Sequence, residues 1–170
     1  MILAGLHANQ IIVQDLKPSN VLLDEQGDLV VADFGLAVMV ERTITSSMIS
    51  QSRTTGAGAG TIDYMAPEQH DSGTFGKVSQ KTDMWALGCI ILEMLTGRSA
   101  WAGKRPTEVM FHVAMKREAP PIPSGLPEGL ESVLRACLVH SQEQRASAQE
   151  VAEMLQPTGQ TVAMQEEEAV

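Results

Sequence analysis

The chain has 170 residues, of which 44% are apolar and 19% are charged, and its formal net charge is −9. This composition is typical of a globular domain and excludes a chain that is disordered throughout, while the acidic balance excludes a surface that binds nucleic acid or anionic membranes by charge alone. The longest apolar run, at residues 84–92, is far shorter than the roughly 20 residues that a membrane-spanning helix needs.

The chain carries no sign of secretion. Its first ten residues lack a basic segment followed by an apolar core, so they do not form a secretory signal. The two cysteines, Cys89 and Cys137, are too few for a disulfide framework and are expected to be buried thiols in a reducing compartment. We therefore expect a protein of the cytoplasm or the nucleus.

The N-terminal part of the chain predicts a short helix followed by three β-prone runs, at residues 11–13, 21–23 and 29–32. The residues between the last two runs are Asp-Glu-Gln-Gly, and Gly27 can adopt the positive φ of a tight turn. The sequence therefore predicts a β-hairpin.

Residues 35–60 are rich in Ser, Thr, Gly and Ala and nearly free of large apolar side chains. Such a segment has no face to bury and predicts a long loop, and loops of this length are usually functional or disordered. Its hydroxyl side chains fit two interpretations equally well, a phosphorylated loop and a simply solvated one. They are Thr43, Thr45, Ser46, Ser47, Ser50, Ser52, Thr54 and Thr55.

The remainder, up to about residue 155, has mainly helical periodicity. Residues 81–95 are apolar on nearly all sides, which is typical of a central buried helix, and Gly97 is placed to end it. Further helices are predicted at residues 108–116 with Thr107 as N-cap, at 128–139, and after a capping box at 147–150. The predicted fold class is therefore mainly α with a small β-hairpin region (α+β), in which helices surround a buried central helix.

The end of the chain differs from the rest. Residues 156–170 contain a run of three glutamates and few side chains that could be buried. We expect a disordered acidic tail here, which leaves residues 1–155 as the folded part.

Four polar side chains gather around the predicted hairpin. Asp15, Lys17 and Asn20 come just before its first strand, and Asp33 directly follows its second. Pairing of the two strands would bring Asp33 beside Asn20. Carboxylate and amide oxygens near an ammonium group suit Mg²⁺ bound to phosphate oxygens, and one carboxylate remains to orient a nucleophile.

This pattern resembles that of the eukaryotic protein kinases, because five motifs stand in the family's order and spacing. The lysine of the first motif is typical of the serine/threonine type. The motifs are residues 15–20 (Asp-Leu-Lys-Pro-Ser-Asn), 33–35 (Asp-Phe-Gly), 66–68 (Ala-Pro-Glu), 83–88 (Asp-Met-Trp-Ala-Leu-Gly) and Arg145. The likeness covers residues 3–155 and implies the C-terminal, catalytic lobe of a kinase.

The resemblance implies transfer of the γ-phosphate of ATP, with Mg²⁺, to Ser or Thr hydroxyls of a protein substrate. Asp15 would orient the substrate hydroxyl and accept its proton, and Lys17 would contact the γ-phosphate. Asn20 and Asp33 would hold Mg²⁺, and Leu22 would form the floor beneath the adenine ring.

Other positions carry over in supporting roles. Thr61 would line the pocket beside the phosphoacceptor, and Asp83 would brace the backbone of the catalytic loop. Glu68 and Arg145 would form a buried ion pair, in which loss of one partner costs about 3–5 kcal/mol. The remaining structural positions that the resemblance implies are Phe34 and Gly35.

The chain departs from the family pattern in two ways. Residues 13–15 read Val-Gln-Asp in place of His-Arg-Asp, so the arginine that pairs with a phosphorylated activation loop is missing. The sequence also lacks the glycine-rich loop, the β3 lysine and the C-helix glutamate of the N-terminal lobe. The glycines at residues 56–60 follow no predicted strand and are not expected to cradle phosphate.

Two functions therefore remain open. The first is a fragment of a full serine/threonine kinase domain, with weak nucleotide binding and little turnover by itself. The alternative is a truncated, catalytically silent kinase-like binding or scaffold module. In either case we expect no nucleic-acid partner and no membrane span.

Overall fold

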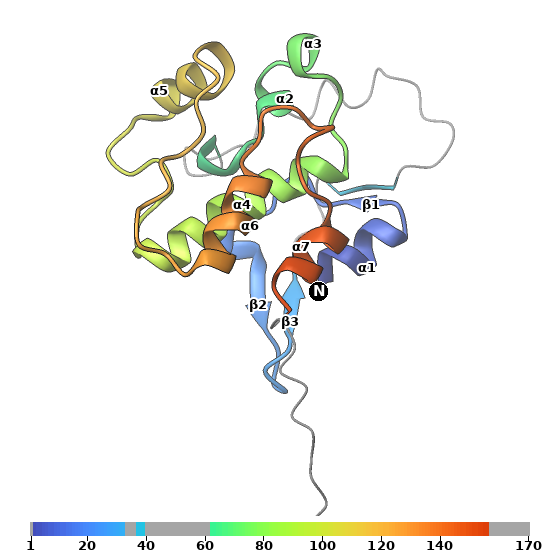
Figure 1. Ribbon diagram of the computed structural model, residues 1–170. Coiled ribbons are helices and arrows are strands. Elements are labelled where there is room, and N and C mark those ends of the chain that lie inside the picture. Colours follow the sequence, from blue (N-terminus) through green and yellow to red (C-terminus); the bar gives the residue numbers. More distant parts are fainter. Residues whose placement is uncertain (1, 33–36, 40–61, 157–170) are drawn as a thin grey trace, which may run out of the picture.

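The computed structural model describes residues 2–32, 37–39 and 62–156 (Figure 1). The helices are α1 (Ile2–Ala8), α2 (Pro67–His70), α3 (Ser72–Phe75), α4 (Gln80–Thr96), α5 (Pro106–Met110), α6 (Glu128–Cys137) and α7 (Ala148–Met154). The strands are β1 (Ile11–Ile12), β2 (Val21–Leu23), β3 (Leu29–Val31) and β4 (Val38–Met39). Helices dominate and the strands are short, which confirms the predicted fold class.

Two of the predicted segments fall largely outside this description. They are the loop at residues 35–60 and the acidic tail at 156–170. In the part of the chain that the structure describes, none of the helices has both the length and the apolar character to cross a membrane.

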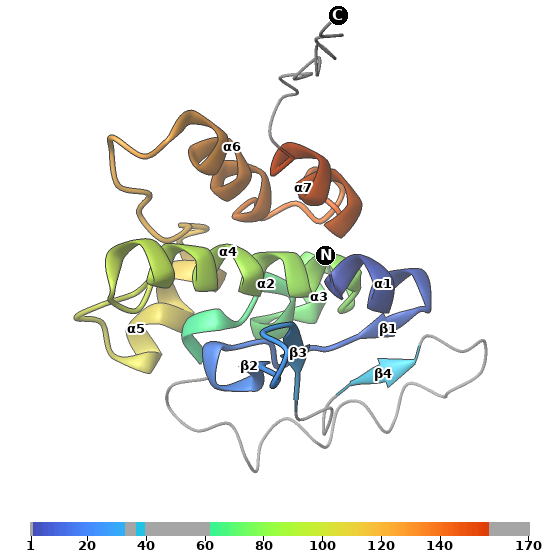
Figure 2. The same ribbon diagram turned by 90° about the horizontal axis from the view of Figure 1, so that it is seen from below.

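Helix α4 runs through the middle of the molecule, with α6 and α7 on one side and α5 and the β2–β3 hairpin on the other (Figure 2). Side chains on all sides of the helix are buried between residues 82 and 92, among them Met84, Trp85, Cys89, Ile90 and Leu92. Gly97 ends the helix in the left-handed conformation, with φ 68°. The predicted central helix is therefore confirmed, except that its last turn reaches solvent, where Met94 is 78% exposed.

Two apolar clusters hold α4 in place. One joins it to α1, α7 and the hairpin and includes Leu3, Val13, Leu16, Val31, Met84, Ile90, Val133 and Val151. The other joins it to α5 and α6 and includes Trp85, Cys89, Leu92, Trp101, Val109, Val113, Leu134 and Leu138. Because each fully buried aliphatic or aromatic side chain stabilises the fold by roughly 1.5–3 kcal/mol, these two clusters together hold the middle of the central helix, residues 84–92.

The two cysteines are buried free thiols, as the sequence predicts. Burial raises the pKa of the Cys137 thiol to about 12 and that of Cys89 further still. Neither thiol is therefore poised as a nucleophile.

Strands β2 and β3 form the predicted antiparallel hairpin, which projects from the helical body (Figure 1). Gly27 has φ 85° in the turn, and the Asp24 carboxylate accepts the backbone N–H groups of Gln26 and Asp28. The first β-prone run is shorter than predicted: β1 ends at Ile12 and pairs with β4 instead of with the hairpin. The next residue, Val13, is turned into the core.

For the helix predicted at residues 108–116, the predicted first residue is wrong. Helix α5 begins at Pro106, because proline has no N–H to satisfy at the first helical position. The residue before it is Arg105, not Thr107, and its N–H donates to the Glu108 carboxylate at 2.8 Å. The chain then continues as one turn of π-helix at Phe111–Met115.

The last two helices follow the prediction more closely. Helix α6 ends at Cys137, two residues earlier than expected, because Leu138 leaves the helical conformation. Helix α7 begins with the predicted capping box: the Ser147 hydroxyl accepts the Glu150 N–H, and the Glu150 carboxylate accepts the Ser147 N–H. These helices cover the side of α4 that faces away from the hairpin.

Gly88 marks a close approach of α4 to the end of α6. A Cβ at this position would lie 2.9 Å from the Leu138 side chain and 3.0 Å from the Cβ of Cys137. We therefore expect Gly88→Ala to lower the free energy of unfolding by about 1–3 kcal/mol through overpacking, despite alanine's higher helix propensity.

Gly129 in α6 provides the matched control, because a Cβ there would meet nothing within 4 Å. Gly129→Ala should leave stability unchanged or raise it by about 0.5–1 kcal/mol. Urea unfolding of both variants tests this pair, and equal stability of the two would contradict the packing argument.

The loop after α6 places His140 against the core. Its Nε2 donates to the Val113 carbonyl at 3.2 Å, and its ring meets Trp85 edge-on with centroids 5.1 Å apart. Burial, the largest cause, lowers the pKa of His140 below its usual 6.5. The folded protein therefore prefers the neutral imidazole.

This preference predicts a pH dependence of stability. The unfolded chain binds the proton more readily than the folded one, so His140 stabilises the fold above pH about 6.5 and this contribution is lost as the pH falls toward the lowered folded pKa. In urea unfolding between pH 7 and pH 5, the wild type should lose more stability than His140→Gln. Equal losses in the two proteins would contradict the prediction.

Candidate active site

The loop before the hairpin brings three of the predicted site residues together. Lys17 Nζ lies 2.6 Å from Asp15 Oδ2, and Asn20 Nδ2 donates to the backbone carbonyl of Asp15 at 2.9 Å. A 3-10 turn at Pro18–Asn20 runs directly into β2 and buries Asn20. Within the described residues, Asp15 Oδ1 is buried and has no hydrogen-bond partner. One carboxylate oxygen is therefore held by the ammonium group, and the other remains to accept a proton.

The hairpin directs the end of β3 toward this loop. Val21 pairs with Val31, and the Ala32 N–H donates to the Asn20 carbonyl at 2.8 Å. Asp33 follows immediately but lies outside the described residues, so its contact with Asn20 stays a prediction. The other predicted site residues outside the described part are Phe34, Gly35 and Thr61.

The first turn of α4 holds the backbone just before Asp15 in place. The Asp83 carboxylate accepts the backbone N–H groups of Val13 and Gln14, each at 2.9 Å. Gln14 has φ 64°, a left-handed conformation that is uncommon for a residue with a side chain. Asp83 thus holds the residue before Asp15 in a strained conformation, as often occurs at functional sites.

Two further residues take part in this support, and the sequence analysis did not identify them. His7 Nε2 lies 2.9 Å from Asp83 Oδ2, and Gln69 Nε2 donates to the Gln14 carbonyl at 2.9 Å. Both contacts join residues more than 50 positions apart. No local pattern in the sequence could have indicated them.

Glu68 and Arg145, which the resemblance pairs, are joined in the structure by a buried bidentate ion pair. The two Nη–Oε distances are 2.7 and 3.1 Å. The Arg145 guanidinium also donates to the carbonyls of Val139 and Lys81, and Thr82 donates its hydroxyl to Glu68. All donors and acceptors of the pair therefore face polar partners, as a buried charge requires.

The hairpin itself presents an apolar surface to solvent. Leu22, the predicted floor beneath adenine, is 50% exposed in β2. Other large apolar side chains of the hairpin that are exposed are Leu23, Leu29 and Val30. Leu22 is therefore accessible to a ligand.

The residues present are compatible with a divalent cation. Asn20 turns its amide nitrogen toward Asp15, so its amide oxygen is the atom that a cation would contact, and oxygen is the ligand that Mg²⁺ prefers. Among residues 2–32, 37–39 and 62–156, no group of three His, Cys, Asp or Glu side chains could hold a metal by itself. A cation here would therefore need Asp33 or phosphate oxygens as further ligands.

Both the matching family model and the similar known proteins are protein kinases. The protein kinase domain model matches residues 2–155. MAP kinase kinase kinase mkh1 of Schizosaccharomyces pombe is 35% identical over 154 residues, covering 88% of this chain and 13% of that protein. Serine/threonine-protein kinase BCK1/SLK1/SSP31 of Saccharomyces cerevisiae is 33% identical over 153 residues, covering 88% and 10%. Mitogen-activated protein kinase kinase kinase 18 of Arabidopsis thaliana is 36% identical over 140 residues, covering 81% and 38%.

The chain thus spans well under half the length of each of these relatives. The family model nevertheless matches nearly all of the chain, and it includes the loop at Asp15, the Asp83 support and the Glu68–Arg145 pair. The chain therefore belongs to the eukaryotic protein kinase family, serine/threonine type.

Proposed function

We propose that this chain forms the catalytic lobe of a protein kinase that transfers the γ-phosphate of ATP to Ser or Thr hydroxyls of a protein substrate. The observation that carries the proposal is the difference between the contacts of the two Asp15 carboxylate oxygens. One of its oxygens lies 2.6 Å from the Lys17 ammonium group, and the other is buried without a hydrogen-bond partner in the described part of the chain. This is the arrangement expected of a group that orients a hydroxyl and accepts its proton.

Each residue of the site has a role in this reaction. Asp15 positions the attacking hydroxyl, and Lys17 neutralises charge that develops on the γ-phosphate oxygens. Leu22 contacts the adenine ring, and Asn20 together with Asp33 would hold Mg²⁺, which supplies further charge neutralisation when bound. Thr61 is assigned to the wall beside the phosphoacceptor by resemblance.

The reaction also needs parts that these 170 residues do not supply. Kinase catalysis uses a glycine-rich loop and a β3 lysine over the phosphates, and neither motif occurs in this sequence. We propose that this stretch by itself holds ATP from one side and binds it weakly. The buried free thiols Cys89 and Cys137 fit a reducing compartment such as the cytoplasm or nucleus.

The proposal predicts that Asp15→Asn removes nearly all phosphate transfer, by a factor of about 10²–10⁴, because the amide cannot accept the hydroxyl proton. Transfer of radiolabelled γ-phosphate to a Ser/Thr peptide mixture is measured with Mg-ATP. The protein used in this assay is the product of the longest open reading frame that encodes this chain.

Asp28→Asn is the matched control, since Asp28 is exposed in the turn of the hairpin, just before β3 and at the far end of the hairpin from Asn20. Its activity should equal that of the wild type. Activity that survives Asp15→Asn would overturn the assignment of Asp15. Complete lack of transfer in the wild type would favour the alternative, a catalytically silent binding module.

A further inference from the structure

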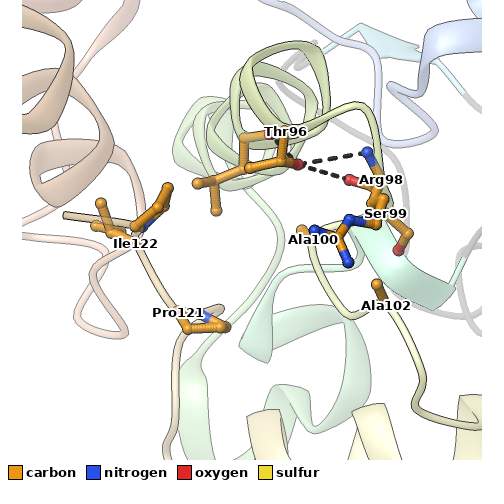
Figure 3. Close-up of a pocket in the computed structure, with 9 residues that line it drawn as sticks. Thr96, Arg98, Ser99, Ala100, Ala102, Pro121 and Ile122 are labelled. Atoms are coloured by element: carbon orange, nitrogen blue, oxygen red, sulfur yellow. Dashed lines mark hydrogen bonds between the residues drawn. The ribbon is translucent and has the colours of Figure 1, made fainter. Parts of the chain in front are cut away.

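A concave site lies at the C-terminal end of α4, outside the catalytic loop. It is a cavity of about 280 Å³ that opens between the end of α4, the loop that follows it, and the segment after the π-helical turn (Figure 3). Its lining is mostly apolar: Leu92, Thr96, Ala100, Ala102, Pro121 and Ile122. The volume lies just below the range of about 300–1,000 Å³ typical of small-molecule sites, so it suits one or two side chains better than a cofactor.

One positively charged side chain, that of Arg98, also lines this mostly apolar pocket. Figure 3 shows the Arg98 side chain turned toward the space beside Ala100, between Thr96 and Pro121. Within the described residues, no hydrogen bond or ion pair engages the Arg98 guanidinium. A guanidinium with five N–H donors beside an apolar pocket is well suited to a bidentate contact with a carboxylate.

The backbone that carries Arg98 is fixed. The Thr96 hydroxyl accepts the Arg98 N–H at 3.4 Å, and its proton lies within reach of two carbonyls, that of Leu92 at 2.8 Å and that of Arg98 at 3.0 Å. Gly97 supplies the left-handed turn between them. The base of the Arg98 side chain is therefore held at the mouth of the pocket.

The wall of the pocket is held equally firmly. Ser99 donates its hydroxyl to Asp63 at 2.5 Å and accepts the N–H of Trp101 at 3.2 Å. Leu92, which lines the pocket, and Trp101, which follows the lining residue Ala100 in the chain, are both buried. A binding partner would therefore meet a formed surface and would not have to order it.

Arg98 is the one charged residue among the described residues that line the pocket, and the nearby Asp63 carboxylate is engaged by Ser99. Residues 98–105 contain Arg98, Lys104 and Arg105 and no acidic residue, whereas the chain carries a net charge of −9. Arg105 is engaged with Glu108, and Lys104 interacts with the carboxylates of Glu108 and Glu118. Within the described residues, this leaves the Arg98 guanidinium for an external group. Charge complementarity of this kind favours an acidic partner.

From these observations we infer that the cavity is a docking pocket for an acidic segment of a partner protein. An Asp or Glu carboxylate of that segment pairs with the Arg98 guanidinium, and a neighbouring aliphatic side chain fills the space lined by Leu92, Ala102 and Ile122. One guanidinium matches one carboxylate, which distinguishes this site from the multi-cation sites that bind phosphate groups. Docking does not require phosphoryl transfer, so it can be tested separately from the proposed function.

The test measures binding of short fluorescein-labelled peptides to the 170-residue chain by fluorescence anisotropy. The probe has the sequence Ser-Gly-Glu-Leu-Glu-Gly-Ser, and its matched control has Gln in place of Glu. We expect the Glu peptide to bind with an affinity that falls with added salt, and the Gln peptide to bind about tenfold more weakly or worse.

Two variants separate the contributions of charge and shape. Arg98→Ala should weaken binding of the Glu peptide about tenfold or more, with Arg98→Lys intermediate because an ammonium group cannot make the bidentate contact. Ala102→Leu should weaken binding of both peptides by filling the pocket. Arg135→Ala, which removes an exposed arginine on α6, should bind as the wild type does.

Several outcomes would overturn the inference. They are equal binding of the Glu and Gln peptides, unchanged binding by Arg98→Ala, tighter binding of a phosphoserine version of the probe, and absence of binding at about 1 mM peptide, the weak end of measurable affinity. Thermal unfolding of each variant checks that a loss of binding does not reflect a loss of fold.

Discussion

Arg145→Gln is expected to lower the free energy of unfolding by about 3–5 kcal/mol, because it leaves the Glu68 carboxylate buried without its charged partner. The Arg145 side chain is fully buried, and its guanidinium also satisfies backbone carbonyls in the loop before α7 and at the start of α4. Its loss therefore leaves several buried acceptors without donors. Urea unfolding at pH 7 measures the change.

Arg135→Gln is the control for this prediction. Arg135 makes a salt bridge of the same kind with Glu131, at 2.7 Å, but on the exposed surface of α6. Such exposed pairs contribute only about 0.3–0.5 kcal/mol, so this variant should unfold almost as the wild type does. If the two variants lost similar stability, burial would not be the cause of the effect.

The ion pair also bears on the site. Glu68 lies in α2, directly before Gln69, which holds the Gln14 carbonyl. Arg145 fastens this helix to the C-terminal part of the chain. Loss of the pair is therefore expected to loosen the support of the catalytic loop as well as the fold.

Asp83→Asn is expected to destabilise the protein by about 3 kcal/mol. The amide keeps one acceptor oxygen but replaces the other by an NH2 group, so one or two of the three hydrogen bonds are lost, and hydrogen bonds to charged groups contribute about 1.5–3 kcal/mol each. The effect should be concentrated at the catalytic loop. In the wild type, the amide hydrogens of Val13 and Gln14 should exchange slowly, because Asp83 accepts both. In Asp83→Asn, exchange at these two amides should become faster than at the core amides of α4.

Asp28→Asn serves again as the matched substitution, because Asp28 lies on the exposed hairpin. It should change neither overall stability nor exchange at Val13 and Gln14. Uniform acceleration of exchange across the whole of Asp83→Asn would indicate a global loss of stability and would contradict a specific support of the loop. Unchanged exchange at these amides would contradict it as well.

Much of the fold could be predicted from local patterns. The central helix follows from apolar side chains on all sides of residues 81–95, and the hairpin follows from two β-prone runs around a turn with a glycine. The capping box at Ser147 placed the start of α7. These features succeed because they depend on residues within a few positions of one another.

Other elements could not be predicted in this way. Two residues could mark the start of α5: Pro106 as its first helical residue, or Thr107 as its N-cap. Capping preference predicted Thr107, but the helix begins at Pro106. The strand formed by residues 11–13 ends at Ile12, because the Val13 side chain is buried in the core and its N–H donates to Asp83. Tertiary contacts overrode the local β preference.

The family and the residue types of the site can be identified from local motifs, since Asp15, Lys17 and Asn20 stand within six positions and need only a short loop to meet. What holds that loop in place, and where the Arg98 pocket forms, depend on contacts between distant parts of the folded chain. The contacts of Asp83 with His7 and of Gln69 with Gln14 join distant parts of the chain, and the Arg98 pocket has walls from two separate segments. Such contacts arise from packing around α4, and packing is a property of the folded chain that no short stretch of residues specifies.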